Sequence, residues 1–552
     1  MVVVVEQNGT HAAAITPKRL TLDGIGARRA KAGRLVASTA SYSDSDMFKS
    51  PYAYGKPKAK RWEHLFSQES LARGPCVLKQ AAKYLKQPGM ISLGGGLPAP
   101  ENFPIDSLSL RVPTPPYFTE AETHGPLGQD ITIGKYDARN PDGESVFDLS
   151  IGMNYGQSVG AAPLVRWVTE HTELVNAPPY SDWRCALTVG STGALEQALR
   201  IFCDRARGDS ILTEEFSFST ALETALPLGI RVFGVGMDGE GLVPERLDEV
   251  LSNWDPAARG GARKPTVLYT VPSGQNPTGA TQSLQRRREV YKVCQKHDVY
   301  IFEDEPYYYL QMPAYNSSNG HANGHTNGHT NGHANGAVAL PAETIEEFLE
   351  SLVPSLLSID TDGRVLRMDS FSKVVVPGSR VGWITASEEV VDRFIRHAEC
   401  CNQGPSGISQ LVMHKLVDET WGHEGYLRWL MHLRREYTRR RDTILAACEK
   451  YLPRDLVSWV PPAAGMFLWL QIDPAQHPRA GAVSLLEIEE QLFFTCIAKG
   501  VLATRGSWFR AEPDRPLSGL FFRTTFAAAS ESNIAAAVER FGAAVREVFG
   551  RS

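Results

Sequence analysis

The chain has 552 residues, and its 57 basic and 62 acidic side chains leave a formal net charge of −5. This length allows two or more domains, and the balanced charge argues against nucleic acid as a partner. No apolar run is long enough to cross a bilayer, so we expect no membrane association. The eight cysteines form no Cys-x-x-Cys pair, which excludes the usual zinc and redox motifs and fits a reducing compartment.

The first 50 residues are rich in small and polar side chains and show no hydrophobic period. We therefore expect a disordered arm over 1–50. Basic residues cluster at 28–34 as in an organelle transit peptide, but acidic residues lie on either side of them. We expect a cytoplasmic protein rather than a mitochondrial one.

Strand-like apolar runs alternate with helical patterns from residue 185 onward. This alternation predicts an α/β fold whose mostly parallel sheet is covered by helices on both faces. Ligands of such sheets bind at the carboxyl ends of the strands. The predicted strands are 186–189, 210–213, 231–235, 266–271, 299–303, 365–368 and 381–385.

The chain divides into four predicted parts, of which the arm is the first. We expect 51–150 to contribute to a small domain and to the active site, and 151–395 to form the large domain. A smaller α+β domain should occupy 396–552. Within the large domain, an Asn-Gly-His repeat at 316–337 cannot build a core and is predicted to be a flexible insertion.

The most informative motif is Ser-Phe-Ser-Lys at 370–373, which follows an apolar strand and precedes a Pro-Gly turn and Arg380. A buried lysine is costly unless it is used, and a desolvated lysine amine attacks aldehydes. The two hydroxyls and the planar guanidinium suit a phosphate. An aldehyde and a phosphate on one small molecule indicate pyridoxal phosphate. The alternative is a β-hairpin with a surface lysine and arginine.

Two further motifs follow other strands. Gly-Ser-Thr-Gly at 190–193 opens a helix, whose free amides favour an anion. An ordinary helix cap by Ser191 or Thr192 is the alternative. Asn276, in Asn-Pro-Thr-Gly, has an amide that can donate to a phenolic oxygen, although a plain Asn-Pro turn accounts for it equally.

An acidic motif ends the strand at 299–303. Asp304 can pair with the ring nitrogen of a cofactor and keep it protonated. Tyr307 can donate to a ring oxygen of the same cofactor. A solvated acidic turn beside core tyrosines is the alternative.

In this order, Gly-Ser-Thr-Gly, Asn-Pro-Thr-Gly, Asp-x-x-Tyr and Ser-x-Ser-Lys-x6-Arg resemble the fold-type I pyridoxal-phosphate aminotransferases. The likeness is strongest to fungal aromatic amino-acid aminotransferases, which themselves resemble kynurenine/2-aminoadipate aminotransferases. It covers roughly residues 60 to 550 without the insertion. The residues that carry it are 92–98, 269–279, 303–311, 367–383, 465–467 and 506–509.

This resemblance implies a catalytic role for two residues. Lys373 would bind the cofactor covalently and then move the proton of the substrate, and Asp304 would pair with the pyridinium so that the ring withdraws electrons. Asn276 and Tyr307 would bind the ring oxygen, and Phe218 would stack on the ring. The resemblance assigns the phosphate to Ser191, Thr192, Ser370, Ser372 and Arg380.

The resemblance also implies a substrate site. Arg523 would bind the α-carboxylate of the substrate together with Asn276, and Gly96 would present its backbone. Tyr155 would reach in from the partner subunit, so that a homodimer with shared active sites is required. Lys79 stands where some relatives carry an arginine that meets the distal end of the substrate. No metal site is expected.

The function implied is a ping-pong transfer of the amino group of an aromatic amino acid, kynurenine or 2-aminoadipate to a 2-oxo acid such as 2-oxoglutarate. The aminoadipate reaction would belong to lysine biosynthesis. One alternative is another fold-type I enzyme, such as a carbon–sulfur lyase or a cyclopropane-carboxylate synthase. Another is a non-catalytic sensor domain, which would need an N-terminal DNA-binding domain that residues 1–60 do not suggest.

Overall fold

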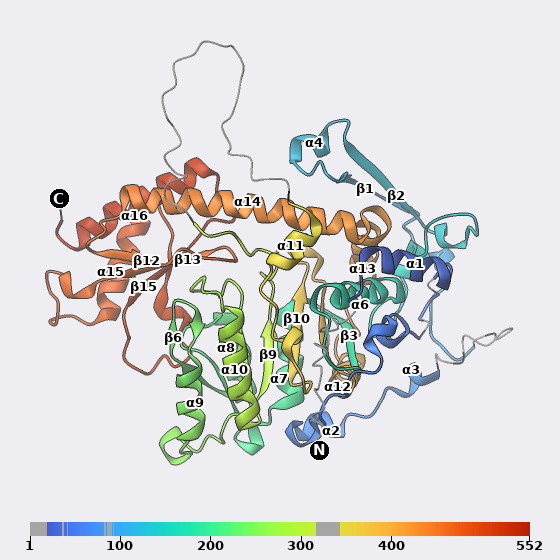
Figure 1. Ribbon diagram of the computed structural model, residues 1–552, viewed down its shortest axis with the longest axis horizontal. Coiled ribbons are helices and arrows are strands. Elements are labelled where there is room, and N and C mark those ends of the chain that lie inside the picture. The colour runs from blue at the N-terminus through green and yellow to red at the C-terminus, as the bar shows by residue number, and fades with distance from the viewer. Residues whose placement is uncertain are drawn as a thin grey trace, which may run out of the picture.

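The computed structural model describes residues 19–551 except 36–37, 41, 82–83, 85–90, 92 and 316–342. At its centre is a seven-stranded sheet with the order β3-β11-β10-β9-β8-β4-β5 (Figure 1). Among these strands, β11 runs antiparallel to both of its neighbours and the other six run parallel. The strands are β3 (Trp183–Thr188), β4 (Ser210–Glu214), β5 (Arg231–Val235), β8 (Val267–Thr270), β9 (Tyr300–Asp304), β10 (Val365–Ser370) and β11 (Gly382–Ser387).

These are the seven strands that the sequence predicts, displaced at either end by at most three residues, so the predicted α/β class is confirmed. Five of them, β4, β8, β9, β10 and β11, are buried at every position. A strand buried along its whole length needs cover on both faces. The helices that contact strands of this sheet include α6 (Ala162–Asn176), α7 (Gly190–Phe202), α8 (Ser219–Ala225), α9 (Pro244–Ser252) and α12 (Glu388–Cys400). This part of the chain also contains α10 (Leu284–His297), α11 (Ile345–Ser351) and α13 (Gly407–His414), of which α10 packs on α9, α11 on α14 (Gly422–Tyr451) and α13 on α6.

Helix α10 shows how local sequence sets such an element. Its N-cap Ser283 accepts a hydrogen bond from the amide of Arg286, and the helix ends at Asp298, which is in the left-handed region with φ of 55°. Val290 and Cys294, one turn apart, are both fully buried. One face of the helix therefore packs on the core while its charged face remains in solvent.

A second sheet, in the C-terminal part, has the order β12-β13-β15-β14 and is antiparallel throughout. The 30-residue helix α14 starts near the hairpin of β1 (Ser107–Pro113) and β2 (Gly128–Gly134) and crosses the molecule to this sheet (Figure 1). The elements are α14 (Gly422–Tyr451), β12 (Val457–Trp459), β13 (Phe467–Ile472), α15 (Leu485–Ala498), β14 (Thr504–Arg505), β15 (Leu520–Thr525) and α16 (Glu531–Val548). Strands β6 (Met237–Asp238) and β7 (Gly241–Leu242) form a separate two-stranded sheet.

The prediction of a disordered arm over 1–50 is wrong for helix α1 (Leu22–Ala32). Arg29 forms ion pairs with Glu170 of α6, at 2.5 Å, and with Asp418, at 2.6 Å. Both carboxylates are almost fully buried and therefore need a cationic partner. Because α1 buries only one of its own residues, its order comes from these distant contacts and leaves no periodic signal.

The segment after α1 also has regular structure. It comprises α2 (Gln68–Ala72), α3 (Val77–Ala81), β1 (Ser107–Pro113), α4 (Glu120–His124), β2 (Gly128–Gly134) and α5 (Leu149–Gly152). Strands β1 and β2 pair antiparallel, and Phe118 beside them packs edge-on against Trp429 of α14. This contact ties the hairpin to the C-terminal half.

The division of the chain into parts at 150 and 395 stays a prediction. Both limits fall inside helices, the first in α5 and the second in α12. The predicted insertion at 316–337 lies outside the described residues, as do 1–18 of the arm. None of the described helices is long and apolar enough to cross a membrane.

Candidate active site

A cavity of about 330 Å³ lies where the carboxyl ends of the parallel strands meet the C-terminal sheet. This is the edge at which open α/β sheets bind their ligands. Eleven of the predicted site residues line it: Ser191, Thr192, Phe218, Asn276, Asp304, Tyr307, Ser370, Ser372, Lys373, Arg380 and Arg523.

One end of the cavity is built around the start of helix α7. The helix has no side-chain cap at its N-cap residue, Val189, so the hydroxyls of Ser191 and Thr192 do not serve as the ordinary cap. Gly190 has φ of 70°, and a Cβ there would lie 2.5 Å from Nη2 of Arg380. Because Gly190 has no Cβ, the guanidinium of Arg380 can lie close to the free amides at the start of the helix.

Two serine hydroxyls join the same end. Ser370 donates to Oγ of Ser372 at 2.7 Å, and Nη1 of Arg380 donates to Oγ of Ser372 at 3.4 Å. Arg380 precedes β11, whose antiparallel course brings its first residues to the carboxyl edge of the sheet. Hydroxyls, free amides and a guanidinium together make a receptor for a phosphate-like anion.

The same cavity holds the carboxyl group of Asp304, the last residue of β9. Its Oδ2 accepts a hydrogen bond from the hydroxyl of Tyr269 at 2.9 Å. Its Oδ1 is buried and makes no hydrogen bond of good geometry with the described residues, although the nearby hydroxyl of Ser191 also opposes the rise in its pKa. Burial raises the pKa of Asp304 to about 6, against the opposing effect of the Tyr269 hydrogen bond.

Lys373, three residues after the end of β10, lines the same cavity. Burial lowers the pKa of its amine, and the nearby cations Arg380 and Arg523 lower it further. No carboxylate in the described part of the chain forms an ion pair with it. A larger fraction of this amine is therefore neutral, and hence nucleophilic, than of a surface lysine.

Arg523, on β15, enters the cavity from the C-terminal sheet. Its Nη1 donates to Oδ1 of Asn276 at 2.8 Å, and its Nη2 donates to Oγ1 of Thr504 at 3.4 Å. The rings of Phe467 and Phe509 flank the guanidinium at 4.5 and 4.6 Å. Burial lowers the pKa of Arg523, and no described carboxylate pairs with it. The cavity therefore contains a partly desolvated cation without a counterion.

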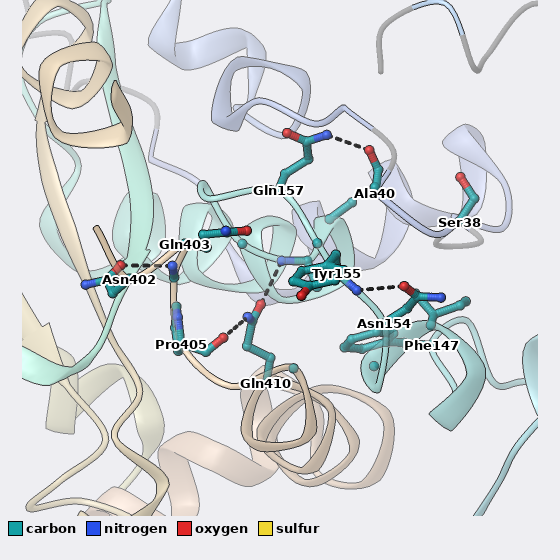
Figure 2. A pocket seen from close by; sticks show the side chains of 18 of the residues that line it. Ser38, Ala40, Phe147, Asn154, Tyr155, Gln157, Asn402, Gln403, Pro405 and Gln410 are labelled. Atoms are coloured by element: carbon teal, nitrogen blue, oxygen red, sulfur yellow. Dashed lines mark hydrogen bonds between the residues drawn. The ribbon is translucent and has the colours of Figure 1, made fainter. Parts of the chain in front are cut away.

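Two predicted residues do not line this cavity. Tyr155 has 59% of its surface exposed and lines a second cavity, of about 380 Å³, together with Gln403 and Gln410 (Figure 2). No charged residue of the described chain lines that cavity, so it offers no charged group to a carboxylate or a phosphate. Gly96 is exposed in a loop. The carbonyl oxygen of Pro98, in the same loop, accepts a hydrogen bond from the side chain of Asn154.

Lys79 also lies elsewhere. Its Nζ donates to the carbonyl oxygen of Gly156 at 2.5 Å, beside the Tyr155 loop. Within one chain, therefore, the residues predicted to act in catalysis and anion binding converge on one cavity. The residues predicted to meet the far side of the substrate lie outside it.

Comparison with known proteins gives consistent matches. The family model for class I and II aminotransferases matches residues 181–541. An aromatic amino acid aminotransferase of Schizosaccharomyces pombe is 41% identical over 493 residues, which cover 89% of this chain and 98% of that protein. The L-tyrosine:2-oxoglutarate aminotransferase atrD of Tapinella panuoides is 35% identical, with 77% of each chain covered. The crystal structure of the aminotransferase Aro8 from Candida albicans superposes with a TM-score of 0.80 and 39% identity, covering 90% of this chain and all of that one.

The chain belongs to the class I and II aminotransferases. This aminotransferase has the fold-type I architecture, and its cofactor is pyridoxal 5′-phosphate. The residues present fit that cofactor, because the start of α7 supplies an anion receptor and Asp304 supplies a buried carboxylate oxygen without a well-formed hydrogen bond to the described residues. A protonated ring nitrogen is a donor for such an oxygen. Lys373 lines the same cavity.

Sequence reasoning gave no role to several residues of this aminotransferase site. Tyr269 holds Asp304 and Phe509 flanks Arg523, yet each looks like an ordinary core aromatic in its own stretch. The likeness to the family does include both stretches, 269–279 and 506–509, and that was the available signal. Thr504 gave no signal because only strand pairing brings it opposite Arg523.

Proposed function

We propose that this aminotransferase moves the amino group of an aromatic amino acid, kynurenine or 2-aminoadipate to a 2-oxo acid such as 2-oxoglutarate, in two half-reactions that share one site. The observation that carries the proposal is the unpaired cation of Arg523, in the same cavity as the amine of Lys373. A carboxylate receptor beside a nucleophilic amine is what an α-amino acid and a 2-oxo acid both need. The names of the relatives in S. pombe and T. panuoides support aromatic donors and 2-oxoglutarate as the acceptor.

Lys373 is the residue that performs chemistry. When bound, the cofactor supplies an electron sink that makes the α-proton of the substrate acidic. The lowered pKa of the lysine amine favours its neutral form, which would take that proton from Cα of the substrate and return it at C4′ of the cofactor. The same amine holds the cofactor covalently between turnovers.

Asp304 keeps the electron sink effective. Its free Oδ1 is the acceptor that a protonated ring nitrogen requires, and a positive charge there stabilises the ionised carboxylate against the cost of burial. Asn276 and Tyr307 supply donors for the ring oxygen. Phe218 packs against the ring face.

The remaining polar side chains orient rather than react. Ser191, Thr192, Ser370, Ser372 and Arg380 bind the phosphate, so that the reactive end of the cofactor is directed towards Lys373. Arg523 binds the α-carboxylate of the substrate in the plane set by its own hydrogen bond to Asn276.

We also propose a homodimer in which Tyr155 and the backbone of Gly96 complete the site of the partner subunit. Two features support this. Tyr155 is exposed in the single chain, and large apolar side chains lie exposed in the neighbouring segments, with Leu78 at 76% and Leu93 at 96%. Exposed apolar groups gathered in this way mark interaction surfaces.

The compartment and the pathway belong to the same proposal. The eight cysteines are free thiols, as expected in a reducing compartment, and we propose the cytoplasm. If 2-aminoadipate is a donor in the cell, the reaction belongs to lysine biosynthesis.

A donor panel with the purified holoenzyme tests the function. Phenylalanine, tyrosine, tryptophan, kynurenine and 2-aminoadipate are each supplied with 2-oxoglutarate, and glutamate is measured. We expect glutamate with at least the aromatic donors. Pyruvate or ammonia without glutamate would show that transamination is wrong, and cofactor binding without any turnover would indicate a sensor domain.

A further inference from the structure

The two rings that flank Arg523 are held in different ways. Phe467 lies in strand β13 and is paired with Thr525 of β15, so the sheet itself fixes its position. Phe509 lies outside the sheet, in the 3₁₀ helix Gly506–Phe509 that follows β14. Its ring is 4.6 Å from the guanidinium of Arg523, and something other than strand pairing must keep it there.

A buried carboxylate holds the turn that carries Phe509. Glu489, on α15, has only 1% of its surface exposed. It accepts the amide of Ser507 at 2.9 Å, the hydroxyl of Ser507 at 2.5 Å and Nε of Arg505 at 2.9 Å. Three donors from two residues of this turn, Arg505 and Ser507, make Glu489 a specific anchor.

The other side of the turn is held by the large sheet. The carbonyl oxygen of Phe509 accepts the amide of Ser217 at 2.7 Å, and Phe216 and Arg510 form an isolated β-bridge. Ser217 directly precedes Phe218, which lines the cavity. The turn therefore lies between Glu489 on one side and the wall of the cofactor site on the other.

We propose that Glu489 is a positioning residue for the carboxylate receptor, and that it acts through Ser507 and Phe509 on Arg523. A guanidinium binds a carboxylate with two parallel hydrogen bonds only in its own plane, and the two rings packed against it help to set that plane. Without the anchor the turn can shift, and Phe509 then no longer holds the guanidinium in the orientation that binds a carboxylate. The inference rests on the role proposed above for Arg523.

The test compares Glu489→Ala, Ser507→Ala and Phe509→Leu in the holoenzyme, with Glu539→Ala as the charge-matched control. Glu539 lies on α16 and is exposed. We expect each of the three variants to raise KM about tenfold for amino donors and 2-oxo acids alike while kcat changes by less than about twofold. The control should change neither.

A binding measurement separates positioning from simple structural support. The Kd of 3-phenylpropanoate, a carboxylate that cannot react, should rise in parallel with KM when measured calorimetrically on the holoenzyme. If Glu489→Ala lowers the melting temperature but leaves KM and this Kd unchanged, the proposal is wrong. Should Glu489→Ala fail to fold, Ser507→Ala decides by the same criterion.

A double variant identifies the route. In the Phe509→Leu background, Glu489→Ala should raise KM no further, because its effect passes through the missing ring. A further tenfold rise would overturn the proposal. If the wild type turns over no amino acid at all, the proposed function fails, while the 3-phenylpropanoate affinities still test the role of Glu489.

Discussion

Nη1 of Arg523 donates to Oδ1 of Asn276 over 2.8 Å, across the junction of the two sheets. Asn276 belongs to the loop after β8, and Arg523 belongs to β15 of the C-terminal sheet. Because the amide oxygen of Asn276 is used in this bond, its amide nitrogen is left to donate into the cavity. One contact thus orients the carboxylate receptor and the proposed donor to the ring oxygen together.

Replacing Arg523 by lysine should weaken every substrate to a similar degree. The charge remains, but the two parallel donors and the bond to Asn276 are lost. Loss of one charged hydrogen bond, about 1.5–3 kcal/mol, corresponds to a rise in KM of roughly 10- to 100-fold. Steady-state kinetics with two amino acids and two 2-oxo acids measure it, with the exposed Arg428→Lys as the control. A rise limited to one class of side chain would instead place Arg523 at the distal end of the substrate.

Lys373→Ala should abolish the covalent link to the cofactor. After treatment with borohydride, mass spectrometry of the wild type should find the cofactor on the peptide that contains Lys373, and the variant should carry none. Turnover should fall by at least about 100-fold, because the group that moves the proton is also gone. The exposed Lys450→Ala is the matched control. A variant that still carries the cofactor covalently would disprove the assignment.

Asp304→Asn should stabilise the protein freed of cofactor, and only above acidic pH. The folded-state pKa of Asp304 is raised from 3.8 to about 6 by burial. Below about pH 4 the group is protonated in both folded and unfolded states, so the wild type and the variant should be alike. As the pH rises from about 4 to 6 the unfolded state ionises first, which costs the wild type roughly 3 kcal/mol that the asparagine does not incur.

The measurement is thermal unfolding of the cofactor-free proteins at pH 4.5, 6 and 8. The gain in melting temperature should grow over this range and then level off. With cofactor added, the order should reverse, since asparagine cannot pair as an anion with the ring nitrogen. A gain that is the same at all three pH values would show that the carboxyl group is not the cause.

Arg29→Met should lower the free energy of unfolding of the protein, although Arg29 does not line the cavity. Glu170 and Asp418 would lose their shared partner while remaining buried. Breaking a buried pair costs about 3–5 kcal/mol, and the remaining contacts of Arg166 with Asp418 and of His423 with Glu170 place the expected loss near the lower end.

Urea unfolding measures this loss, and the exposed Lys31→Met on the same helix is the control. Adding Glu170→Gln to Arg29→Met should recover part of the stability, because one uncompensated charge is then removed. If Arg29→Met were as stable as the wild type, the packing of α1 would contribute nothing to the fold.

Tyr155 should act in the site of the partner subunit. Lys373→Ala and Tyr155→Ala are each expected to be nearly inactive alone, so the two chains are coexpressed with different tags and the mixed dimer is purified. In the mixed dimer, the chain with intact Lys373 faces intact Tyr155 of the partner subunit, and one site of the two should work. If Tyr155 served its own chain, the mixed dimer would be as inactive as either parent.

Local patterns were sufficient for the seven strands of the large sheet, since apolar runs and the turns between them are set by neighbouring residues. They were also sufficient for the motifs around Ser191, Asn276, Asp304 and Lys373, because each motif lies within a few residues of a strand end. Parallel strands then bring these ends to one edge. The convergence of ten of the eleven predicted residues on one cavity follows from that geometry, whereas Arg523 comes from the C-terminal sheet.

Long-range packing alone established the rest. In the sequence, Tyr269 looks like any core tyrosine. Only the pairing of β8 with β9 brings its hydroxyl to Asp304. Arg29 looked like part of a disordered arm because its partners, Glu170 and Asp418, are 141 and 389 residues away. Contacts between residues so far apart leave no period or spacing in the chain, and only the folded structure makes them visible.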